Sequence, residues 1–128
     1  MTLSKEQINK ADDFKTIEVP VPEWGGSVLV RTISGTERDA FEQTIFDGKS
    51  QSARLTNIRA RLAALTMVDE KGKRLYEDKE IATLGRKSAK PLDRIYDAAA
   101  KLNGLSKDDV EDLAKNSETG PSDDSTSP

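Results

Sequence analysis

Two segments of this sequence have residue types and spacing that resemble known chemical sites. Residues 69–80 begin with Asp and have Glu at the twelfth place, as a calcium-binding loop does. However, Lys71 and Lys73 occupy positions that need ligand oxygens, and the glycine is misplaced, so a charged hairpin turn explains the segment better than a metal site. Ser88 and Lys90 lie close together, as a serine nucleophile and a lysine base would, but Ser88 is better explained as the N-cap of a helix.

The composition excludes most other chemistry. The 128 residues include no His and no Cys, so the commonest general base, the commonest metal ligand and the thiolate nucleophile are missing. The sequence contains no glycine-rich phosphate-binding loop. Its paired carboxylates lie at predicted helix starts or in polar runs, where solvated or dipole-stabilising roles are expected. We therefore expect no catalytic residue, no cofactor and no metal site.

Basic residues in the middle of the chain raise the alternative of nucleic-acid binding. Arg54, Arg59 and Arg61 lie in one predicted helix, and a basic helix can follow a phosphate backbone. Acidic residues are interspersed, however, and the net charge is -3, whereas nucleic-acid and membrane binding favour basic chains. No apolar run is long enough to cross a membrane, and the N-terminus is not a signal peptide. A solvated helix face, or a patch for an acidic protein partner, is the favoured explanation of the three arginines.

The elements that position these residues can be predicted from the pattern along the chain. Residues 1–13 are expected to form an arm or short helix, and residues 14–116 the folded domain. Alternation over 14–21 and β-branched residues over 27–33, separated by a turn at 22–26, predict a β-hairpin. Because Pro20 and Pro22 lack amide donors, the first strand is expected at a sheet edge. Residues 117–128 lack large apolar side chains and are expected to be a disordered acidic tail.

Helical patterns dominate the rest of the domain. Ser34 and Glu37 form a capping box that opens the first helix. The next helix carries an apolar stripe at positions 55, 58, 62 and 65 and is expected to end near Met67. A second short hairpin over 68–76 and three further helices follow, opened by Asp78, Ser88 and Ser106. The sequence therefore predicts a small, mostly helical α+β domain.

The only tryptophan, Trp24, lies directly before Gly25 and Gly26 in the predicted hairpin turn. In one interpretation the indole folds over the hairpin and covers the helix that begins near Thr36, while the glycines supply positive φ angles. In the other, Trp24 is an exposed anchor for a partner, since Trp is enriched at binding hot spots. Packing is favoured because aromatic residues make up only 5% of the chain.

Three blocks of the sequence resemble the tail assembly chaperones of long-tailed bacteriophages and prophages. The first block covers the hairpin and the start of the next helix, residues 19–41. The second is the arginine-bearing helix with its DEKGKRL turn, residues 57–76. The third combines residues 84–96 and 104–116. The blocks match the family in order and content, and together they cover roughly the whole predicted domain.

The resemblance implies a non-enzymatic protein that binds the tape-measure protein, keeps it unaggregated and helps recruit tail-tube subunits. It also implies action in the bacterial host cytoplasm, absence from the finished virion and compatibility with self-association. Many members have a longer frameshift product, and the acidic end of this chain resembles the shorter one. Candidate partner-binding residues are Trp24, Arg54, Arg59 and Arg61. The alternative is a nucleic-acid-binding or regulatory module using residues 54–61, which steep salt dependence would reveal.

Overall fold

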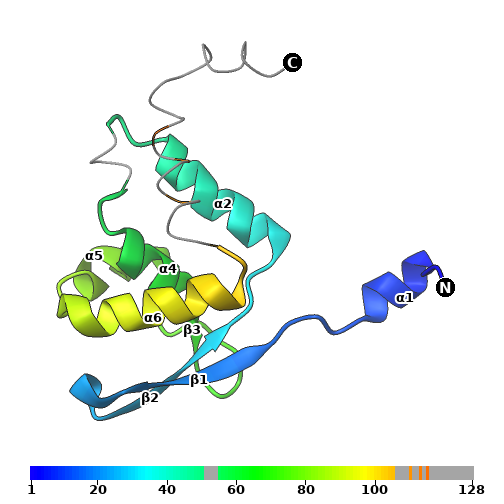
Figure 1. Cartoon of the computed structure of the whole chain (residues 1–128), viewed down its shortest axis with the longest axis horizontal. Coiled ribbons are helices and arrows are strands. Elements are labelled where there is room, and N and C mark those ends of the chain that lie inside the picture. Colours follow the sequence, from blue (N-terminus) through cyan, green and yellow to red (C-terminus); the bar gives the residue numbers. More distant parts are fainter. Residues whose placement is uncertain (51–54, 106–109, 111–112, 114, 116–128) are drawn as a thin grey trace.

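The computed structural model describes residues 1–50, 55–105, 110, 113 and 115, and it has the predicted α+β architecture (Figure 1). The strands are β1 (Thr16–Val21), β2 (Gly26–Arg31) and β3 (Met67–Val68). Two 3-10 turns are η1 (Pro22–Trp24) and η2 (Asp78–Glu80). The α-helices are α1 (Lys5–Lys10), α2 (Gly35–Phe46), α4 (Ile58–Thr66), α5 (Ile81–Leu84) and α6 (Ala89–Leu102).

The predicted hairpin forms the larger part of a three-stranded antiparallel sheet. β1 and β2 pair with Val19 opposite Val28, and β3 joins the other side of β2 with Leu29 opposite Val68. The strand order is β1-β2-β3, so β1 lies at an edge, as Pro20 within it and Pro22 just after it predicted. The third strand was not predicted, because its two residues read as the end of one helix and the start of a second hairpin.

One face of the sheet is covered by helices (Figure 1). Val19, Val21 and Val30 are buried on this face, and α6 packs across β1 and β2 while α4 packs beside α6. The predicted start of α6 is confirmed, since Ser88 is its N-cap, although without a side-chain hydrogen bond, and its apolar face includes the completely buried Ile95. Asn103 fixes the end of α6 to the sheet, since its Oδ1 accepts from the Ile33 amide at 2.8 Å.

The helix predicted through residues 55–67 is not continuous. α4 begins at Ile58, because Asn57 is in the left-handed conformation with φ 58° and ψ 22°. Asparagine tolerates this conformation better than most residues. The side chain of Asn57 lies against Gly85, where a Cβ atom would come within 2.4 Å of Oδ1. The absence of a side chain at Gly85 therefore makes room for the side chain of Asn57 in this position.

The predicted second hairpin is reduced to a single bridge between Val68 and Arg74. The Asp69 carboxylate closes its turn by accepting from the amides of Lys71 and Lys73 at 2.8 and 3.0 Å. The next helical segment is capped by Glu77 rather than by Asp78. Asp78 instead accepts a hydrogen bond from Arg74 at 2.8 Å.

The N-terminal arm contains α1, which has a Ser4 capping box and no buried residue. It projects from the hairpin, away from the helices (Figure 1). At the other end, Val110 is buried in the core and Leu113 packs against it. The predicted helix start at 106–109 and the predicted tail at 117–128 lie outside the described residues. None of the described helices has the length and apolar character needed to span a bilayer.

Candidate functional site

The start of α2 is fixed to the rest of the domain by an ion pair. The predicted capping box is present: the Ser34 side chain accepts from the Glu37 amide, and Glu37 accepts from the Ser34 amide. Arg31, at the end of β2, donates two hydrogen bonds to the Glu37 carboxylate at 3.1 and 2.7 Å. It also donates to the Leu65 carbonyl of α4 at 3.0 Å. This cluster therefore connects β2, α2 and α4.

Burial and hydrogen bonding act on Glu37 in opposite directions. Burial raises the pKa of its carboxyl, but the hydrogen bonds from Arg31 and from the Ser34 amide outweigh that effect. The resulting pKa lies below the ordinary value of 4.5. Glu37 is therefore ionised at neutral pH, and its pairing with Arg31 gives it a structural role.

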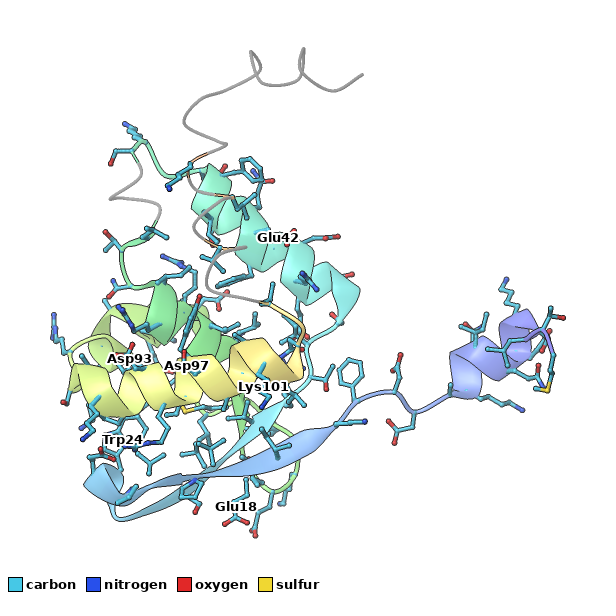
Figure 2. The ribbon with its side chains drawn as sticks, in the orientation of Figure 1. Glu18, Trp24, Glu42, Asp93, Asp97 and Lys101 are labelled. Atoms are coloured by element: carbon cyan, nitrogen blue, oxygen red, sulfur yellow. The ribbon has the colours of Figure 1, made fainter. Side chains whose placement is uncertain are left out.

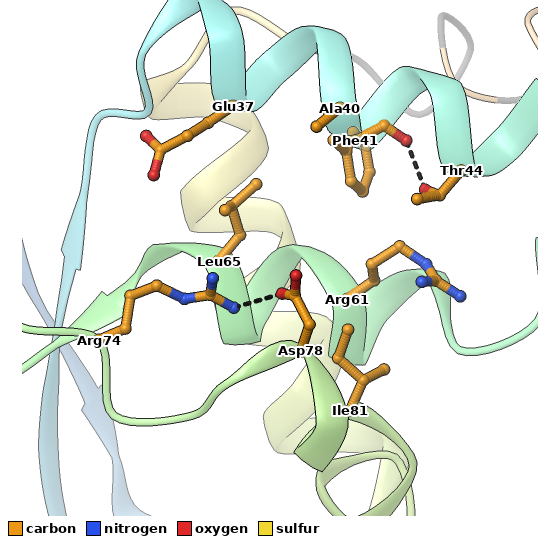
Figure 3. Close-up of a pocket in the computed structure, with 9 residues that line it drawn as sticks. All are labelled: Glu37, Ala40, Phe41, Thr44, Arg61, Leu65, Arg74, Asp78 and Ile81. Atoms are coloured by element: carbon orange, nitrogen blue, oxygen red, sulfur yellow. Dashed lines mark hydrogen bonds and ion pairs between the residues drawn. The ribbon is translucent and has the colours of Figure 1, made fainter.

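Beyond this ion pair, a groove of about 410 Å³ lies between α2 and the α4–α5 side of the domain (Figure 3). Phe41 of α2, Leu65 of α4 and Ile81 of α5 supply its apolar surface. Ala40 and Thr44, one helical turn apart, contribute small side chains from α2. The charged residues along the groove are Glu37, Arg61, Arg74 and Asp78.

The charges of the groove are compensated within the chain, with one exception. Arg74 donates to Asp78 at 2.8 Å and to the Ala64 carbonyl at 2.9 Å, and Glu37 is paired with Arg31. The Arg61 guanidinium has no hydrogen-bond or ion-pair partner among the described residues. Its guanidinium points away from the Arg74–Asp78 pair (Figure 3). As far as the structure describes its lining, the groove therefore combines apolar surface with one unpaired, half-buried cation.

Trp24 lies at the turn of the hairpin, next to the N-terminal half of α6 (Figure 2). Its side chain is partly buried and packs against the core, as the packing interpretation predicted. The helix that adjoins the turn is α6, because Arg94 donates to Glu23 at 2.5 and 2.8 Å. The expectation that Trp24 covers the helix near Thr36 is wrong, since α2 begins beyond the opposite end of β2.

The prediction that both glycines of this turn have positive φ angles is correct for only one of them. Gly25 has the expected positive φ, 81°, whereas Gly26 does not and is the first residue of β2.

The Arg94 hydrogen bonds lower the pKa of Glu23 to about 2. Glu23 is therefore ionised, and available to pair with Arg94, at neutral pH.

The structure separates the arginines that the sequence grouped together. Arg59 and Arg61 are two positions apart on α4, which places them about 200° apart around the helix. Arg59 pairs with Asp93 of α6, whereas Arg61 lines the groove. Arg54 lies outside the described residues. A single basic face for phosphate binding is therefore not formed by Arg59 and Arg61.

Sequence reasoning missed the groove itself. Its α2 side consists of Glu37, Ala40, Phe41 and Thr44, which have the i, i+3, i+4, i+7 spacing of one helix face. That spacing is present in the sequence, but it does not show which element faces this side of α2. Phe41 is buried, and it contributes to the core and to the groove.

Comparison with known proteins now identifies the family. The profile described as "Phage tail assembly chaperone" matches residues 3–116. The chain belongs to the phage tail assembly chaperone family. This confirms the resemblance seen in the sequence, and the match also includes α1. No curated protein matches the sequence.

A solved structure shares the fold of this phage tail assembly chaperone. The structure of the bacteriophage HK97 tail assembly chaperone matches with a TM-score of 0.58 and 19% sequence identity. The match covers 80% of this chain and 95% of the HK97 chain. At this level of identity, the likeness extends to the arrangement of the elements and not to individual site residues.

Proposed function

We propose that this chain is a non-enzymatic assembly chaperone that binds the tape-measure protein of a phage tail. In this proposal it keeps the tape-measure protein from aggregating and helps recruit tail-tube subunits, in the host cytoplasm and without entering the finished virion. The observation that carries the proposal is the family match over residues 3–116. The groove beside α2 supports it, because it offers an apolar surface to a partner.

The size of the groove suits a chaperone that acts in many copies. A stable protein–protein interface buries about 800 Å² on each partner, and a groove of about 410 Å³ receives only a few side chains. Each copy would therefore bind with modest affinity, and occupancy along a long helical partner would come from many copies. Weak individual binding also allows the chaperone to be displaced when tail-tube subunits assemble.

Co-expression with the tape-measure protein from the same genome tests this function. We expect the tape-measure protein to be insoluble alone, soluble with the chaperone, and co-purified with it at moderate salt. Binding of apolar helices should change little when salt rises from about 0.1 to about 1 M, where charge interactions are screened. A tape-measure protein that stays insoluble would contradict the proposal. Co-purification of nucleic acid, lost steeply with salt, would support the nucleic-acid alternative instead.

The recruitment step needs a separate measurement. Purified tail-tube subunits would be added to the soluble complex of chaperone and tape-measure protein, and assembly followed by sedimentation and electron microscopy. We expect tubes to form around the tape-measure protein as the chaperone is released. Equal tube formation with and without the chaperone would contradict its role in recruitment.

A further inference from the structure

We propose that the groove between α2 and the α4–α5 side binds an amphipathic helix of another protein, and that Arg61 pairs with a carboxylate beside the apolar stripe of that helix. This inference rests on the proposed function when the helix is assigned to the tape-measure protein. It adds which surface of the chaperone makes the contact and which side chains the partner must present.

The shape of the groove favours a helix as its occupant. Ala40 and Thr44 are exposed and lie one turn apart on α2, so their small side chains leave a shallow channel along that helix. The Thr44 hydroxyl is turned inward and donates to the Phe41 carbonyl at 2.6 Å, which leaves its methyl group to contact a ligand. Phe41 and Leu65 lie on opposite sides of the gap (Figure 3). Apolar side chains spaced one turn apart on a partner helix fit such a channel.

The charge of the groove specifies the polar part of the partner. Among the described arginines, Arg61 and Arg86 have no ion pair or side-chain hydrogen bond. Arg86 is exposed, whereas Arg61 is half-buried. A partner that covers the groove removes water from Arg61 and must supply a compensating charge, because a desolvated unpaired cation is costly. Asp or Glu beside the apolar stripe meets this requirement, and Lys or Arg at the same place is repelled.

Two synthetic helical peptides provide the first test with the full chain. Each would have about 21 residues, long enough to hold a helix, and the same leucine stripe, flanked by Glu in one peptide and by Lys in the other. Fluorescence anisotropy would measure the dissociation constants. We expect the Glu peptide to bind about tenfold more tightly, a difference in the range of close interfacial charge pairs. Equal binding, or a preference for the Lys peptide, would overturn the inference.

Charge reversal on α4 assigns this preference to Arg61. Arg61→Glu is expected to invert the preference between the peptides. Arg59→Glu is the matched control, since it makes the same change in net charge on the same helix but lies at the Asp93 contact outside the groove. The Arg59→Glu variant should still prefer the Glu peptide. If both variants change the preference equally, net charge rather than the groove determines binding, and the inference is wrong.

Filling the groove tests its apolar part. Ala40→Trp places a large side chain in the channel and is expected to weaken the Glu peptide at least about tenfold. Ala82→Trp, on the exposed surface of α5, is the control and should bind as the wild type does. Circular dichroism and thermal melting would confirm that both variants fold. Unchanged binding by folded Ala40→Trp would exclude the groove as the site.

The experiments must also distinguish the partner helix from a second copy of this chain as the occupant of the groove. Sedimentation velocity of the wild type and of Ala40→Trp over a range of concentrations would detect self-association through the groove. We expect both to sediment identically. Association of the wild type that is lost in Ala40→Trp would show that another copy occupies the groove, and would overturn the inference.

Co-expression separates this inference from the proposed function. If the wild type, Arg61→Glu and Ala40→Trp all solubilise the tape-measure protein equally, the proposed function stands and the groove assignment fails. If the wild type binds the Glu peptide as expected but leaves the tape-measure protein insoluble, the groove assignment stands and the proposed function fails. Solubilisation by the wild type, lost in both groove variants, supports the two together.

Discussion

Replacing Glu37 with Gln is expected to destabilise the fold, because this carboxylate joins three elements. It accepts hydrogen bonds from Arg31 at 3.1 and 2.7 Å and from the Ser34 amide at 2.9 Å, while Arg31 also contacts the Leu65 carbonyl. Glutamine has nearly the same shape and keeps one acceptor oxygen. Its NH2 group, however, cannot accept from Arg31, and the half-buried guanidinium loses its counter-charge.

The magnitude can be estimated from the exposure of the pair. The side chains of Arg31 and Glu37 are 15% and 30% exposed. Exposed pairs contribute about 0–1 kcal/mol, and breaking a fully buried pair costs about 3–5 kcal/mol. A partly buried pair with good geometry should lie between, so we expect a loss of about 2 kcal/mol. In a domain of this size that corresponds to a decrease in Tm of about 10 °C.

The pKa of Glu37 determines how the stability lost in Glu37→Gln depends on pH. The folded-state pKa of Glu37 is depressed below the ordinary 4.5, so its stabilising contribution is fully present above about pH 4.5. It is lost as the pH falls through the folded-state pKa. The difference in free energy of unfolding between the wild type and Glu37→Gln should therefore be largest at neutral pH and shrink below about pH 4.5.

Urea unfolding at several pH values measures both effects, with free energies from linear extrapolation. Glu42→Gln is the control on the same helix, because Glu42 forms a long and more exposed pair with Arg38 at 3.4 Å. We expect Glu42→Gln to cost less than about 0.5 kcal/mol. If Glu37→Gln is as stable as Glu42→Gln at neutral pH, or if its deficit persists unchanged in acid, the reasoning is refuted.

Two further substitutions test the packing of the fold. Trp24→Ala should lower the free energy of unfolding by about 2 kcal/mol, less than a fully buried Trp, since Trp24 is only partly buried against the core; a variant with unchanged Tm and lost partner binding would favour the anchor interpretation. Gly85→Ala should cost less than about 1 kcal/mol, because its Cβ would lie 2.4 Å from Asn57 Oδ1, the end of a side chain that can turn aside. Asn57→Gly in the same chain should recover part of that loss, as measured by thermal melting, and an additive loss would contradict the steric explanation.

Much of the fold could be predicted because its signals are local. The capping box at Ser34 and Glu37 acts across three residues, and the apolar stripe of α6 has the helical period. The turn at Asn57 could not be found in this way. The side chain of Asn57 lies against Gly85, 28 positions away, and the third strand depends on Leu29 and Val68 meeting across the sheet.

The candidate site was less accessible to sequence reasoning. The sequence placed Arg59 and Arg61 in one group by residue type, but their roles depend on helix phase and on distant partners. Asp93, which pairs with Arg59, is 34 positions away. The groove likewise requires α2 and α5 to face each other across α4, and no pattern within α2 specifies that arrangement. The partner-binding roles of Trp24, Arg54, Arg59 and Arg61 stay predictions.

Most of the described arginines are paired with carboxylates, and Arg61 is an exception. Hydrophobic residues make up only 34% of the sequence, and arginine–carboxylate pairs add connections between elements: Arg94 joins α6 to η1, and Arg59 joins α4 to α6. Arg86 is exposed, where water solvates it and a partner adds little. Arg61 shares a half-buried groove with Phe41 and Leu65, so a carboxylate brought by a partner would be screened less there than at the open surface. Among the described residues that line the groove, Arg61 is therefore the charge that folding leaves unpaired, and our proposal assigns its pairing to the partner.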